Sequence, residues 1–132
     1  MKTAASMIRF ILGPTRASIL PLALAVERTA YLRFAENRTM DDIAMMKDVY
    51  AFVAVQTSKT LANATRTVER LANLCWDALC ADDELMRRFI GKFLPNKPTP
   101  SEMLFYLAYV LHFDKPYYLV LDFEDGGWAL MI

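Results

Sequence analysis

The sequence predicts a mainly α-helical fold: a helix-turn-helix within a multi-helix bundle, with a β-hairpin extension at the C-terminus. Residues 56–71 have helix-turn-helix spacing, helix-start signals recur along the chain, and strand-forming residues gather after Pro116. With 132 residues, a single core is expected. We expect residues 1–113 to form the helical domain and residues 114–132 the hairpin extension, packed on that domain or used in oligomerisation.

In the N-terminal part, glycine and proline separate two expected helices. Gly13 and Pro14 end a short helix, and a longer one is expected from near Ser18, which we predict to be its cap. Pro21 is tolerated there because the amides of a first helical turn have no partners within the helix.

The next helix-start signal is Thr39, which precedes two acidic residues at 41 and 42. Threonine is a good helix cap, and acidic side chains are favourable at the positive end of the helix dipole. We expect this helix to run toward Tyr50 and to bend near residue 52 or 53 before the helix that carries Ser58.

The helix-turn-helix prediction rests on small side chains followed by a buried pair. Ser58 is expected in the first helix and Ala62 in the turn, with the second helix starting near residue 63 or 65. Val68 and Leu71 are three residues apart, share one helix face and are expected to be buried against the first helix.

Residues 82–97 combine a short helix with a basic segment. The acidic run 82–84 predicts a helix start, and Gly91 predicts its end. The formal net charge of the chain is zero, yet residues 85–97 contain no acid. A basic face is therefore still available; its cations are Arg87, Arg88, Lys92 and Lys97.

The strongest local signal is the segment that starts at Thr99. Thr99 is the expected cap, Pro100 occupies the first helical position, and Glu102 completes a capping box. A helix to about His112 should follow.

The tail has a different pattern. Residues 117–123 are rich in strand-forming side chains, 124–127 are turn-like and 128–132 are apolar, which together predict a β-hairpin. Two strands alone are marginally stable, so this hairpin must pack on the helices or pair with another chain.

Several function classes are disfavoured. The best apolar run, 17–26, holds ten residues and is too short for a membrane span, so a cytoplasmic protein without membrane contacts is expected. Cys75 and Cys80 lack a CxxC pairing and are predicted to be reduced core residues, and His112 has no clustered ligand-type neighbours. No catalytic motif is present. We therefore expect no enzyme activity, no metal, no cofactor and no small-molecule substrate.

Beyond these patterns, several short motifs match one known family. They are Val68-Glu69-Arg70, Lys59 with the turn before Thr65, Asp42-Ile43, Lys97-Pro98-Thr99 and Ser101-Glu102. Across residues 12–113 the chain resembles the C-terminal DNA-binding effector domain of the sporulation-initiation master response regulator of spore-forming Firmicutes. The resemblance implies an all-helical domain that reads short boxes in double-stranded DNA, often as tandem copies.

The resemblance has limits in three places. The family recognition helix continues with basic and polar side chains where this chain has Asn73 and Leu74, so we expect a different affinity or target sequence. We expect no receiver domain of the family's kind before residue 4, and therefore no control by phosphorylation within the chain. The tail after Phe113 has no counterpart in the family and is expected to supply a dimer contact of another kind.

Three candidate base-reading residues, Arg66, Arg70 and Asn73, lie on one stripe of the second helix, opposite Val68 and Leu71, and Glu69 borders this stripe. Arginine can bind guanine, asparagine adenine, and glutamate the cytosine amino group. By resemblance, Glu69 and Arg70 are the positions that carry the readout, and helix geometry adds Arg66 and Asn73. The expected phosphate contacts are Lys59, Thr65, Arg87, Arg88, Lys92 and Lys97.

Two other interpretations remain open. The first is that the charged stripe is simply a solvated helix face, as most such stripes are. If the helix does bind DNA, Asp77 on this stripe would repel phosphates, so only the N-terminal half of the helix is expected to enter the groove. The chain could also be a protein-interaction module or antagonist on a helix-turn-helix scaffold that has lost DNA binding. The neutral charge, Leu74 and the apolar tail favour that alternative.

Overall fold

The computed structural model describes residues 3–124, and this part of the chain is mainly helical, as predicted. No strand occurs within it, and none of its helices is long and apolar enough to cross a bilayer. The α-helices are α1 (Ala4–Leu12), α2 (Leu20–Ala30), α3 (Ala51–Thr57), α4 (Leu61–Cys80), α5 (Asp83–Phe89), α6 (Pro100–Phe113) and α7 (Tyr117–Glu124). Between α2 and α3 lie the π-helix Tyr31–Ala35, the 3-10 helix Met40–Asp42 and the π-helix Met45–Tyr50.

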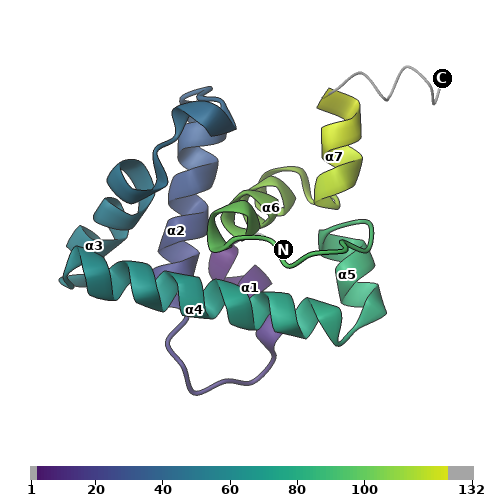
Figure 1. Cartoon of the computed structure of the whole chain (residues 1–132), viewed down its shortest axis with the longest axis horizontal. Coiled ribbons are helices and arrows are strands. Elements are labelled where there is room, and N and C mark those ends of the chain that lie inside the picture. Colours follow the sequence, from purple (N-terminus) through teal and green to yellow (C-terminus); the bar gives the residue numbers. More distant parts are fainter. Residues whose placement is uncertain (1–2, 125–132) are drawn as a thin grey trace.

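Helix α6 forms the centre of the bundle because it is apolar around its whole circumference. Every residue from Met103 to Val110 is buried. The helix packs most extensively against α2, and also against α4, α1 and α7. In Figure 1, α4 crosses one side of the molecule, with α3 at its N-terminal end and α5 at its C-terminal end. This placement leaves one long face of α4 on the surface.

The local helix signals after residue 80 are confirmed. Asp82 caps α5, its Oδ1 accepting the amide of Glu84 at 3.0 Å. The capping box of α6 is complete: the Thr99 amide donates to Glu102 Oε1 at 3.0 Å, and the Glu102 amide donates to Thr99 Oγ1 at 3.2 Å. Gly91 follows α5 with a φ of 96°, a conformation that suits glycine.

The predicted cap of α2 is wrong. The helix begins at Leu20, and Ile19 precedes it without a side-chain hydrogen bond. With Ser18 as cap, Pro21 would be the third helical residue, and proline has no amide hydrogen for the serine oxygen to accept. Pro21 lies in the first turn, as expected. The short helix before Gly13 is confirmed as α1.

The single helix predicted between Thr39 and Tyr50 is interrupted. Thr39 does cap a helix, but it is the short 3-10 turn that ends at Asp42. Ile43 and Ala44 are then extended, and the chain continues helically from Met45 to Thr57. The change of direction therefore occurs at residues 43–44, before the predicted bend at 52–53.

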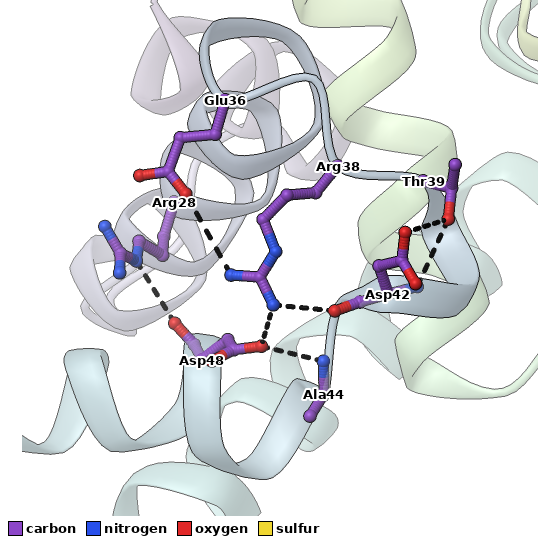
Figure 2. A network of polar contacts seen from close by, with 7 residues as sticks. All are labelled: Arg28, Glu36, Arg38, Thr39, Asp42, Ala44 and Asp48. Carbon is purple, nitrogen blue, oxygen red and sulfur yellow. Dashed lines mark hydrogen bonds and ion pairs between the residues drawn. The ribbon is translucent and has the colours of Figure 1, made fainter.

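Figure 2 shows the polar network that holds this interruption. Asp48 Oδ2 accepts the Ala44 amide at 2.9 Å and Arg38 Nη2 at 2.7 Å. The same Arg38 nitrogen donates to the Asp42 carbonyl at 2.6 Å, and Arg28 Nε donates to the Asp48 carbonyl at 3.1 Å. The Ala44 hydrogen bond and Arg38 hold the pKa of Asp48 below its usual 3.8. The network ties α2 to the segment that leads into α3.

The predicted C-terminal hairpin is not supported. Residues 117–124, expected to hold the first strand, form α7 instead, and residues 125–132 lie outside the described part of the chain. The Tyr117 ring lies 4.4 Å from Tyr106 and 5.1 Å from Tyr109, centroid to centroid, and the Tyr118 amide donates to the Ile90 carbonyl at 3.0 Å. Aromatic residues favour strands only in a suitable packing environment, and here the packing surface is α6.

Candidate nucleic-acid interface

Helices α3 and α4 are joined by a turn of Ser58, Lys59 and Thr60. Ser58 has a φ of 55°, a left-handed conformation that ends α3, and the Lys59 amide donates back to the Ala54 carbonyl at 3.0 Å. Thr60 Oγ1 accepts the Asn63 amide at 3.1 Å and caps α4. The two helices pack on each other, as a helix-turn-helix requires.

The turn lies earlier in the sequence than predicted. Ser58 ends the first helix, but α4 begins at Leu61, so Ala62 belongs to its first turn and residues 63 and 65 are already helical. Sequence reasoning placed the turn at the small Ala62. The left-handed Ser58 and the Thr60 cap complete the reversal before that residue is reached.

The buried face of α4 is the one that the sequence predicted. Val68 and Leu71 are both fully buried. Cys75 and Leu79 continue this face toward the C-terminal end of the helix. Because a helix has a fixed period, burial of this face places the opposite residues on the surface.

The opposite face carries the predicted base-reading stripe. Arg66 and Arg70 are exposed, and Asn73 is half-buried. None of these three side chains makes a hydrogen bond or ion pair with another described residue. Their donors are therefore available to a partner outside the chain. Asp77 lies on the same stripe and is exposed, as expected.

Glu69 and Thr65 lie at the edge of this stripe and are half-buried. Burial raises the pKa of Tyr50, and the nearby Glu69 carboxylate acts in the same direction. The Thr65 hydroxyl donates to Met46 Sδ across 3.9 Å, a weak bond. Both residues thus face the segment before α3 as well as solvent.

The five basic residues among the predicted phosphate contacts fall into two groups at the two ends of α4. Lys59 is exposed in the turn before the helix, whereas Arg87, Arg88, Lys92 and Lys97 are exposed on α5 and the loop after it. A helix of 20 residues is about 30 Å long, so the groups are far apart. The Cζ atom of Arg88 lies 4.8 Å from the centroid of the Phe10 ring, and Nζ of Lys92 lies 4.0 Å from the centroid of the Tyr118 ring. These two cations already have cation–π partners within the chain.

A cavity of about 580 Å³, which the sequence did not indicate, adjoins the turn. Its lining comes from the segment before α2 and that helix's first turn, the end of α3, the turn and α4. Lys59 and Arg70 both line it, and so they share one site. No local signal could have revealed it, because its walls come from segments far apart in the sequence.

The prediction that both cysteines are core residues is half right. Cys75 is buried, and burial raises the pKa of its thiol to about 12. Cys80, at the end of α4, is exposed. The helix period places Cys80 on the surface side, five residues after Cys75.

Comparison of the chain with protein-family models, curated proteins and solved structures found no match.

Proposed function

We propose that the protein is a sequence-specific regulator of transcription that binds double-stranded DNA through α3, the turn and α4, in the manner of the sporulation-regulator effector domains it resembles. The observation that carries the proposal is the exposed stripe of α4. It presents Arg66, Arg70 and Asn73 without partners in the described chain, opposite a fully buried face. A cytoplasmic location follows from this function.

The N-terminal half of α4 is the part that enters the major groove. Arg66 and Arg70 supply the paired donors that recognise guanine, and Asn73 can pair with adenine. Asp77 would meet phosphates if the whole helix lay in the groove, so the C-terminal half tilts away. Lys59 lies at the entering end and contacts the backbone.

The second group of cations lies about the length of α4 from Lys59. One turn of DNA is also roughly 34 Å. Because the C-terminal half of α4 tilts out of the groove, Arg87 and Lys97 are placed for phosphates outside the box, such as those beside the next copy of the protein on tandem boxes. A homodimer or an array of copies on DNA is part of the proposal.

Fluorescence anisotropy with a duplex that contains the family's box and with a scrambled duplex tests this function. Each duplex is titrated at two salt concentrations, because phosphate contacts make affinity depend on salt. Tighter binding to the box is expected. Equal, weak binding to both duplexes would refute sequence-specific recognition.

Arginine variants locate the reading surface. Replacing Arg70 with alanine should cost about 1–3 kcal/mol on the box and reduce the preference for it. Replacing Lys59 should weaken binding to both duplexes alike. It should also reduce the slope of log affinity against log salt concentration by about one. Arg9→Ala removes an exposed charge from α1 and serves as the control, with binding unchanged.

A specific observation also favours the protein-interaction alternative. Leu74 is 42% exposed beside the polar stripe, and Val55 on α3 is 75% exposed. Light scattering of the Leu74→Ser variant, together with the same DNA titrations, separates the two functions. Loss of an oligomer in the variant, with no DNA binding by either form, would favour the interaction module. Removal of the tail is unsuited to this test, because Tyr117 and Val120 of α7 are buried.

A further inference from the structure

We propose that the cavity at the junction of α2, α3 and α4 is a binding site for a small aliphatic carboxylate. Lys59 and Arg70 bind its charged group, and the apolar wall beside α2 binds its chain. The site is lined by the N-terminal end of α2, the C-terminal end of α3 and the N-terminal half of α4; Figure 1 shows how these three helices are arranged.

The electrostatics of the cavity call for an anion. Lys59 and Arg70 line it from two different elements, the turn and α4. None of the described residues that line it is acidic, and neither cation has a hydrogen-bond or ion-pair partner in residues 3–124. Hydrogen bonds between such cations and a carboxylate are the stronger, charge-assisted kind.

The remaining wall determines what the anion is attached to. Leu20, Pro21 and Ala64 supply aliphatic surface, and Leu20 is 54% exposed. No aromatic side chain is among the described lining residues, so a nucleotide base has nothing to stack on. Thr67 and Gln56 add a hydroxyl and an amide group to the lining. An aliphatic chain with a terminal carboxylate satisfies both halves of this lining.

The size of the cavity agrees with a small molecule. Its volume of about 580 Å³ lies within the range of ordinary ligand sites, about 300–1,000 Å³. Those sites combine a mainly apolar lining with a few polar groups that orient the ligand, as here. Another cavity with exposed cations in its lining, Arg87 and Lys92, is smaller, at about 320 Å³.

Occupancy of this site has a consequence for DNA binding. Arg70 and Lys59 are also the proposed base and phosphate contacts, so a bound carboxylate and DNA compete for the same two side chains. This consequence rests on the proposed function, whereas binding of the carboxylate does not. The ligand would then act as an effector that releases the regulator from DNA.

The test is a calorimetric titration of the full chain, without DNA, using octanoate, 1-octanol and acetate as probes. Octanoate should bind saturably at one site. Octanol lacks the charge and acetate lacks the chain, so each should bind at least about ten-fold more weakly. Equal affinity for octanoate and octanol, or no saturable binding of octanoate, would overturn the proposal.

Charge variants locate the site. The K59Q/R70Q double variant should lose at least about ten-fold in octanoate affinity, equivalent to about 1.4 kcal/mol. R9Q/K47Q removes the same number of exposed charges elsewhere and should bind octanoate as the unaltered protein does. Circular dichroism confirms that both variants are folded. If both lose affinity equally, the binding is non-specific attraction and the proposed site is wrong.

A final titration adds octanoate to the complex of protein and box-containing duplex. Displacement of DNA is the expected result. Octanoate binding in a protein that does not bind DNA would refute the proposed function and leave the carboxylate site standing. DNA binding without octanoate binding would do the reverse, so the two failures are distinguishable.

Discussion

Replacing Leu71 with alanine tests the rotational position of α4, which decides the side chains that this helix presents to solvent. Leu71 is fully buried, whereas Leu74, three residues later, is 42% exposed. The same substitution at both positions removes the same isopropyl group from the same helix. The pair therefore compares the two faces of α4 directly, with little difference in helix propensity.

The two losses of stability should differ by more than two-fold. Removing the isopropyl group from a fully buried leucine costs about 2.5 kcal/mol in lost transfer free energy. The cavity left behind raises the expected loss for Leu71→Ala to about 3–4 kcal/mol. Leu74 is only a little over half covered and leaves no closed cavity, so about 1 kcal/mol is expected. The free energy of unfolding of a folded domain is about 5–15 kcal/mol, so both variants should remain folded enough for their stabilities to be measured.

Urea unfolding followed by circular dichroism measures both free energies of unfolding. An equal loss at the two positions, or a larger loss at Leu74, would show that the buried face of α4 is assigned wrongly. Arg66 and Arg70 would then no longer form the exposed stripe on which the proposed function depends. A change in the urea slope would instead indicate that a variant no longer unfolds in two states.

Three further predictions concern other parts of the structure. Asp48 has a lowered pKa, so its contribution to stability is present above pH about 3.8 and is lost as the pH falls through the folded-state value. Urea unfolding across pH should show the stability gap between the protein and its Asp48→Asn variant shrinking below pH 4, and a pH-independent gap would contradict the network. Iodoacetamide should modify the exposed Cys80 of the native protein. Cys75 should react only after unfolding, because it is buried and burial raises the pKa of its thiol to about 12. Mass spectrometry counts the adducts, and modification of both cysteines in the native state would refute the burial of Cys75. Thr99→Ala should cost about 1 kcal/mol in urea unfolding because it removes the acceptor for the Glu102 amide. Thr99→Ser is its control, and similar losses in both variants would show that the hydroxyl is not responsible.

Features that depend on residues close together in the chain could be predicted from the sequence. The capping box of Thr99 and Glu102 spans one helical turn, and the burial of Val68 and Leu71 follows from their spacing. Lys59 and Arg70 were identified as candidates by type and position, but their shared cavity was not. The cause is that Leu20, which also lines this cavity, comes from a distant segment of the chain.

By itself, the sequence determined that the described part of this chain is mainly helical, where α5 and α6 start, and which face of α4 is buried. The tertiary structure decided the rest. It placed Arg38 against Asp48, which interrupts the helix after Thr39, and it packed Tyr117 on α6, so that a strand-like segment became α7. Caps and helix periods act over a few residues and can be recognised locally. Packing and ion pairing depend on which distant segments the folded chain brings together.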